Sequence, residues 1–159
     1  MSVNLNDDSK QFLCNEWNRA FRTVIKLREN LAELSAWKHQ YLTSSGAYLG
    51  DIYKAVENTL RMLVEEIDGE KLQKNDRWHL ALLERSYEHG LIPEVNYKTI
   101  RGMLNYRHFY VHGYAVELNE DIIRQRAPEA IEAFHTFVGH IQTRFDISFE
   151  YSDELSRNT

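Results

Sequence analysis

The strongest constraint on the fold is a near absence of residues that interrupt helices. Among 159 residues there are only two prolines and seven glycines, while 43% of the residues are hydrophobic. A many-stranded fold needs frequent turns, and turns draw heavily on proline and glycine. The composition therefore favours long helices, and a domain of this length buries a sizeable core without disulfides or metals.

Apolar residues recur at intervals of three and four along most of the chain, which is the pattern of amphipathic helices. We predict a first helix from about Ser9 to Leu42, followed by a break at 43–46 that supplies an N-cap for a second helix. Gly69 and Gly90 are predicted to end the second and third helices in the left-handed conformation. The predicted core includes Trp17, Phe21, Val24, Leu27, Leu49, Ile52, Val56, Leu60, Leu63, Leu82, Leu83, Ile100, Phe134, Phe137 and Ile141.

Capping signals divide the second half of the chain into three further helices. Asp76 is predicted to cap the third helix, and Pro93 to lie near the first turn of the fourth. Asn119 is predicted to cap the fifth, which Pro128 should interrupt or kink. The sum is an all-α antiparallel bundle of about five helices. It forms one domain over residues 1–159, with frayed ends at about 1–8 and 150–159.

Charge and targeting features narrow the class of protein. The net charge of −5 argues against a general nucleic-acid coat protein, although a local basic cleft remains compatible with it. The single cysteine, Cys14, has no partner for an intramolecular disulfide, which fits a reducing cytosol. The polar start of the chain lacks the layout of a signal peptide, and no apolar run suits a membrane span. We therefore expect a cytoplasmic protein without membrane association.

The fourth helix carries an unexpected charge on its apolar seam. The spacing of Tyr97, Ile100 and Leu104 continues to Arg107 and then toward Tyr114. An unpaired arginine on such a seam is costly, so we expect an anionic partner, bound water or a cleft beside it. Gly113 is predicted to end the helix, which leaves His112 in its last turn.

Arg107, His112 and Tyr114 form an Arg-x-x-x-x-His-x-Tyr pattern. From the composition, only about 0.03 such triples are expected by chance. The pattern, in the wording YRHFYVHGYAVEL, resembles the HEPN superfamily and in particular its HepT-like ribonuclease toxin branch. The segments DIYKAVENTLRMLVEEIDG and APEAIEAF resemble that branch as well.

The resemblance implies a metal-independent endoribonuclease that acts as a twofold homodimer on an RNA substrate. By position, Arg107 and His112 are the catalytic candidates, and His108 is the polar residue that follows the arginine. Tyr114 matches the tyrosine that a minimal nucleotidyltransferase antitoxin modifies by AMPylation. The resemblance thus implies a toxin–antitoxin pair, and no cofactor or metal ion is expected.

The residue chemistry favours the same mechanism independently. Metal-free RNA cleavage needs a base for the 2′-OH proton and an acid for the departing 5′ oxygen, and histidine suits both roles. A guanidinium fork stabilises charge on the phosphoryl oxygens. One histidine does not easily serve as acid and base in the same step, and a symmetric dimer supplies two. Arg107 and His112 are about 140° apart on an ideal helix, so a site shared between chains also eases their convergence.

Plainer interpretations remain open for each residue. Arg107 would also suit an ion pair with Glu57 or Glu117. Glu57 would otherwise hydrogen-bond into the site or, more simply, lie solvated on its helix face. His108 and His112 are spaced like two metal ligands, but the sequence offers no complete ligand set. Tyr114 would also suit plain packing. At the level of the whole chain, the alternatives are a non-catalytic HEPN module that binds a partner protein or nucleotide, and a helical scaffold with a chance motif.

Overall fold

The structure, a computed structural model, describes residues 3–33, 39–111 and 120–151. These residues form five helices and no strand, which confirms the predicted all-α bundle. The helices are α1 (Asp7–Ala32), α2 (His39–Asp68), α3 (Trp78–Glu88), α4 (Glu94–Val111) and α5 (Glu120–Phe145).

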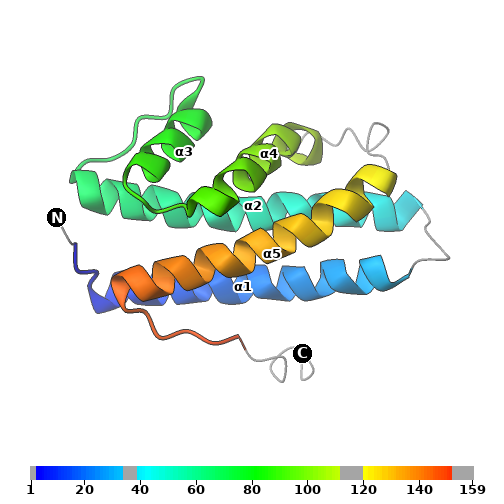
Figure 1. The fold of residues 1–159 in the computed structure, drawn as a ribbon, viewed down its shortest axis with the longest axis horizontal. Coiled ribbons are helices and arrows are strands. Elements are labelled where there is room, and N and C mark those ends of the chain that lie inside the picture. The colour runs from blue at the N-terminus through cyan, green and yellow to red at the C-terminus, as the bar shows by residue number, and fades with distance from the viewer. Residues whose placement is uncertain (1–2, 34–38, 112–119, 152–159) are drawn as a thin grey trace.

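Helix α2 lies at the centre of the bundle and packs against each of the other four helices. Figure 1 shows α1 and α2 running in opposite directions along the length of the molecule. Helices α3 and α4 lie side by side on the edge of α2 that faces away from α1, and α5 crosses α1 and α2 diagonally. Because α3 and α4 both pack on α2, side chains along this edge of α2 can contact both helices.

One apolar core runs through all five helices, and the predicted stripes form it. Trp17, Phe134 and Phe137 are among the largest fully buried side chains. The indole N–H of Trp17 donates to the Thr59 hydroxyl at 3.1 Å, so its buried polar atom is satisfied by α2. The core positions were therefore predictable from the three-and-four spacing alone.

The predicted first helix and the break after it are wrong. The segment Ser9–Leu42 is not one helix, because α1 ends at Ala32 and α2 begins at His39. The predicted break at 43–46 lies inside α2. The Asn30 amide of α1 donates to the hydroxyls of Ser44 and Ser45 at 2.8 and 3.0 Å, and Ser45 is fully buried. These serines are therefore small residues at the α1–α2 contact, where their hydroxyls find partners without capping a helix.

The glycine predictions are confirmed. Gly69 and Gly90 have φ angles of 73° and 70°, and they follow the ends of α2 and α3. Asp76 is not the cap of α3: Arg77 occupies the N-cap position without a side-chain capping bond, and the Asn75 side chain accepts from the Arg77 amide at 3.3 Å. The predicted aspartate cap is thus replaced by an asparagine turn, in which Asn75, one residue before Asp76, accepts the hydrogen bond.

Prolines 93 and 128 differ in effect. Pro93 directly precedes α4, which confirms its predicted place near the start of this helix. Its carbonyl accepts a hydrogen bond from the Asn96 amide at 2.9 Å. Helix α5 continues through Pro128, so the predicted interruption does not occur. The predicted cap of this helix, Asn119, lies outside the described residues.

The segment after α5 returns along α1. Ile147 is 5% exposed, and the ring of Phe149 meets Trp17 edge-on at 5.4 Å between centroids. The Lys10 ammonium donates to the carbonyl of Asp146 at 3.1 Å, which ties the start of α1 to the turn after α5. The chain therefore packs against the core as far as Tyr151, whose ring stacks on Phe21.

Candidate functional site

The structure places one of the predicted site residues fully. Arg107 lies in α4 with a partly buried side chain. The backbone of His108 belongs to the same helix, but its side chain is outside the described part of the chain. His112 and Tyr114 lie outside the described residues altogether, as does Gly113. The convergence of Arg107 with His112 therefore stays a prediction.

The charge of Arg107 acts on Tyr53 of α2. The Tyr53 side chain is fully buried, and its pKa is raised mainly by that burial and further by Glu57, while the charge of Arg107 acts in the opposite direction. The guanidinium thus lies close enough to influence the phenol hydroxyl. Among the described residues, no carboxylate lies within ion-pair distance of Arg107, so the proposed ion pair with Glu57 is wrong; Glu117 lies outside the described residues.

Glu57 is bound instead to a histidine of α3. Its Oε2 atom lies 2.6 Å from Nδ1 of His79, and the two side chains are 7% and 22% exposed. Glu57 is therefore a buried carboxylate, and its interpretation as a solvated helix-face residue is wrong. A single sequence gives no signal for this pair, because its members are separated by a helix end and a connection without a fixed spacing.

The Tyr53 hydroxyl is a polar atom without a satisfying partner. It is buried and has no partner at hydrogen-bond distance and angle within the described part of the chain, although the Glu57 carboxylate is close enough that its charge and its capacity to accept a hydrogen bond both raise the pKa of the hydroxyl. An unsatisfied buried hydroxyl costs roughly 1–3 kcal/mol, which native structures rarely tolerate without reason. Tyr53 and Glu57 are one turn apart on α2, so the hydroxyl, the Glu57–His79 pair and the charge of Arg107 all act on the same stretch of this helix.

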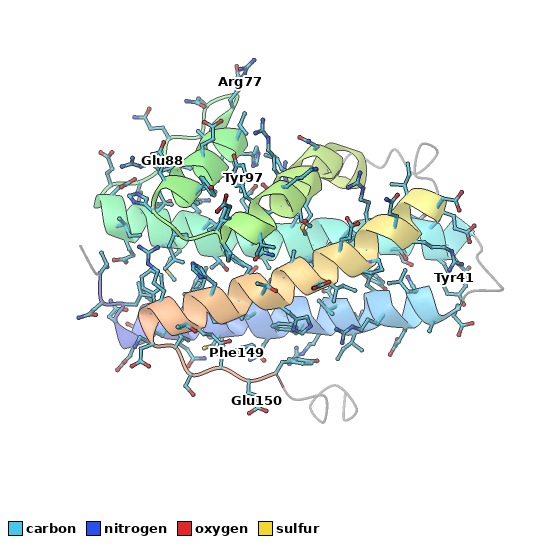
Figure 2. All side chains as sticks on the ribbon, in the orientation of Figure 1. Tyr41, Arg77, Glu88, Tyr97, Phe149 and Glu150 are labelled. Atoms are coloured by element: carbon cyan, nitrogen blue, oxygen red, sulfur yellow. The ribbon has the colours of Figure 1, made fainter. Side chains whose placement is uncertain are left out.

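Positive and aromatic side chains flank this cluster at the start of α3. The ring of Trp78 lies against that of His79, with 3.7 Å between centroids, and the Lys74 ammonium lies 5.3 Å from the centre of the Trp78 ring. Arg77 is exposed and projects outward from the segment that leads into α3 (Figure 2). Such a combination of cations and an aromatic ring suits a backbone phosphate with a neighbouring base.

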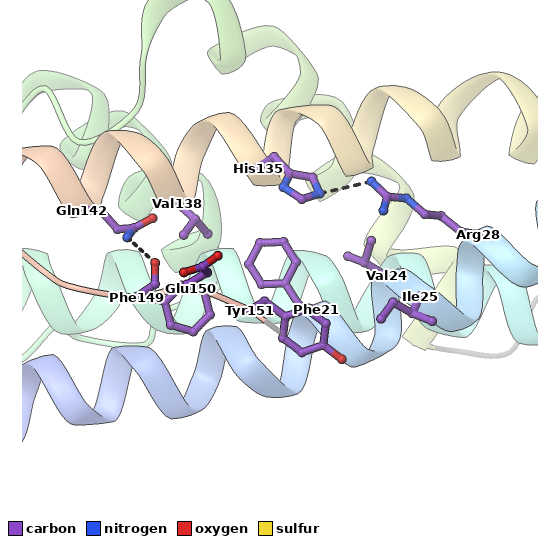
Figure 3. Close-up of a pocket in the computed structure, with 10 residues that line it drawn as sticks. All are labelled: Phe21, Val24, Ile25, Arg28, His135, Val138, Gln142, Phe149, Glu150 and Tyr151. Atoms are coloured by element: carbon purple, nitrogen blue, oxygen red, sulfur yellow. Dashed lines mark hydrogen bonds between the residues drawn. The ribbon is translucent and has the colours of Figure 1, made fainter. Parts of the chain in front are cut away.

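A second hollow lies away from this cluster, between α1, α5 and the segment 149–151. Its volume is about 350 Å³, and Phe21, Arg28, His135 and Tyr151 are among its lining residues (Figure 3). Arg28 contacts Nε2 of His135 at 3.2 Å. Partial burial and, to a smaller extent, the charge of Arg28 lower the pKa of His135. A guanidinium donates only, so this ring nitrogen accepts and the imidazole is neutral.

The described residues contain neither a metal-ligand cluster nor a helix suited to a membrane. No group of three or more His, Cys, Asp or Glu side chains is arranged there to hold a metal ion. Within the same ranges, none of the helices combines the length and hydrophobicity that a bilayer crossing requires. The paired-histidine interpretation of His108 and His112 involves side chains outside those ranges.

Comparison with known proteins identifies the family. A family described as HepT-like protein matches residues 44–147, which is well over half of the chain. The chain belongs to the HepT-like family. The match contains Tyr53, Glu57, His79 and Arg107, so the polar cluster of this HepT-like protein lies entirely in the shared region. No curated protein and no solved structure matches the chain.

The matched region covers part of the structure. The match begins inside α2 and ends just after α5, so it contains neither α1 nor the segment 148–151. The hollow at Arg28 and His135 is built partly from α1 and this segment. The cluster of Tyr53, Glu57, His79 and Arg107 therefore lies inside the matched range, and the hollow lies partly outside it.

Proposed function

We propose that this HepT-like protein is a metal-independent endoribonuclease of toxin type that acts as a homodimer. Arg107 binds the scissile phosphate, His112 supplies acid–base chemistry, and His108 assists as the polar neighbour of the arginine. The product carries a 2′,3′-cyclic phosphate. The observation that supports this role most directly is the partly exposed Arg107, which no carboxylate of the described residues neutralises and whose guanidinium donors suit an anion.

The family and the electrostatics support the same proposal. HepT-like proteins are HEPN-type modules of the toxin class, which the matched residues 44–147 represent here. Lys74, Arg77 and Trp78 lie at the beginning of α3, beside the Glu57–His79 pair. Although the net charge is −5, a few local cations can attract an RNA substrate that binds only transiently.

Cleavage of single-stranded RNA in excess EDTA tests the proposal. We expect the wild type to cut and to leave 2′,3′-cyclic phosphate ends, while Arg107→Ala and His112→Ala lose activity by at least about 10²-fold. Arg101→Ala is the matched control, because Arg101 is an exposed arginine of the same helix. Equal cleavage by His112→Ala and wild type would contradict the assignment.

Regulation by a minimal nucleotidyltransferase antitoxin belongs to the same proposal. Tyr114 is the acceptor, and AMPylation there would place a phosphate two residues from His112. Co-incubation with such an enzyme and ATP is expected to add the mass of one AMP to the wild type and none to Tyr114→Phe. Modification at another residue would refute this acceptor.

The acidic net charge favours a second function, a non-catalytic HEPN module that binds a partner protein or nucleotide. Expression in growing cells separates the two functions. Growth arrest that requires His112 indicates the nuclease, whereas unchanged growth with wild type and His112→Ala indicates the binding module.

A further inference from the structure

The Glu57–His79 pair fixes the state of one imidazole nitrogen. A carboxylate only accepts hydrogen bonds, so the 2.6 Å contact requires the proton to lie on Nδ1 of His79. The other nitrogen, Nε2, is then the acceptor of the neutral ring. Because Glu57 is 7% exposed and lies on the central helix, its contact with Nδ1 fixes the orientation of the imidazole.

The acceptor nitrogen is available to an incoming group. Nε2 of His79 makes no hydrogen bond within the described part of the chain, and it is not one of the buried unsatisfied atoms there. The side chain is 22% exposed, and the Trp78 ring lies against it. A ring that is oriented by a buried acid and open at its second nitrogen is the arrangement of a general base.

The base and the proposed phosphate ligand both act on one stretch of α2. Glu57 and Tyr53 are four residues apart on this helix, about 5–6 Å between their Cβ atoms. His79 binds the first of them, and the charge of Arg107 acts on the second. Helices α3 and α4, which carry His79 and Arg107, pack against each other and along the same edge of α2 (Figure 1).

We propose that His79, positioned by Glu57, is the general base of the ribonuclease site. This inference rests on the proposed function. Nε2 of His79 takes the proton of the 2′-OH, and the 2′ oxygen forms a bond to phosphorus. The bond between phosphorus and the 5′ oxygen breaks, and His112 returns a proton to that oxygen. Arg107 holds the phosphoryl oxygens, so atoms and charge balance within one transphosphorylation.

The assignment also resolves the difficulty of a single histidine. Acid and base act in the same step, and the motif histidine, His112, is assigned the acid role. His79 supplies the other from α3 of the same chain. Glu57 stabilises the imidazolium that forms during the reaction, and it acts as a positioning residue because it works through His79.

The decisive experiment compares two substrates. One is an RNA dinucleotide, whose 5′ oxygen needs a proton to leave. The other is uridine 3′-(4-nitrophenyl phosphate), whose phenolate leaves without one. We expect His79→Asn to be slower than wild type by about 10²- to 10⁴-fold on both substrates, because both need the base. His112→Ala is expected to be slow on the dinucleotide and to recover most of its rate on the nitrophenyl ester.

Suitable variants separate chemistry from folding. The amide of His79→Asn can still donate to Glu57, and His79→Gln is the second variant in which an amide replaces the ring. His89→Asn is the matched control, because Nε2 of His89 binds Asp68 of α2 at 2.9 Å with similar exposure, at the other end of α3. We expect His89→Asn to keep wild-type cleavage. Thermal unfolding of each variant shows which of them is folded.

The outcomes distinguish this inference from the proposed function. If Arg107→Ala is inactive while folded His79→Asn or His79→Gln cleaves both substrates within twofold of wild type, His79 is not the base and the ribonuclease stands. If His79→Asn recovers on the nitrophenyl ester, its role is that of the acid and the assignment is overturned. If wild type cleaves neither substrate, the proposed function and this inference both fall.

Discussion

The strength of the Glu57–His79 contact is a quantitative test of the site. We expect a double-mutant cycle of Glu57→Ala and His79→Ala to give a coupling free energy of about 1.5–3 kcal/mol, the range for hydrogen bonds to charged groups. The value should not be lower, because the N–O distance is 2.6 Å and both side chains are less than one quarter exposed. Solvent screening therefore removes little of the interaction.

The two single variants should differ in a defined order. His79→Ala leaves a buried carboxylate without its partner, and breaking a buried pair in this way costs about 3–5 kcal/mol. Glu57→Ala leaves an imidazole that is already 22% exposed and that water can solvate more readily. We therefore expect the free energy of unfolding to fall more for His79→Ala than for Glu57→Ala, and the double variant to be more stable than additivity predicts.

Urea unfolding at neutral pH, followed by helical circular dichroism, measures all four proteins of the cycle. The control cycle uses Arg61 and Glu65, an ion pair on the same helix with side chains 39% and 22% exposed, where coupling should be about 0.5 kcal/mol or less. A coupling below about 0.5 kcal/mol for Glu57 and His79 would refute the reasoning, because substitutions at sites that do not interact are additive to within that value. A larger loss for Glu57→Ala would refute the account of the buried charge.

Two further predictions concern other polar groups. Tyr53→Phe removes a buried hydroxyl without a hydrogen-bond partner, so urea unfolding should show unchanged stability or a gain of up to about 1 kcal/mol; a loss of more than that would mean that the hydroxyl is bonded. Because the pKa of His135 is lowered in the folded protein, the unfolded chain binds a proton at this residue more readily than the folded chain does. The contribution of His135 to stability is therefore present above about pH 6.5 and is lost as the pH falls through the pKa of the folded state. The thermal midpoint of His135→Gln should therefore decline less than that of wild type between pH 7.5 and 5.5, and equal declines would contradict this.

The fold was largely predictable because it depends on a repeating pattern. Trp17, Leu60 and Phe134 each lie on a stripe of three-and-four spacing, and each is buried. Gly69 and Gly90 marked helix ends because the left-handed conformation excludes most other residues. Such features are local, and a single sequence displays them.

The errors arose where tertiary contacts decide the outcome. Ser44 and Ser45 have the composition of a helix break, but Asn30 of another helix satisfies their hydroxyls inside α2. Glu57 has the spacing of a surface residue, but His79 of another helix makes its burial tolerable. In both cases the hydrogen-bond partner is distant in sequence, so no local sequence pattern predicts it.

The candidate site was predictable in part for the same reason. Arg107 was identified by its place on an apolar seam and by a motif, and both are read along one helix. His79 carries no motif that the sequence analysis recognised, since its role depends on the packing of α3 against α2. The motif residues His112 and Tyr114 lie outside the described residues, so their arrangement stays a prediction.

The return of the chain along α1 bears on how the protein is made. During synthesis α1 is made before α5 and the segment that follows it, yet Trp17 and Phe21 are covered by the rings of Phe149 and Tyr151. A nascent chain therefore exposes part of the apolar face of α1 until the segment 149–151 has been made, and chaperones that recognise such faces can bind it during that interval.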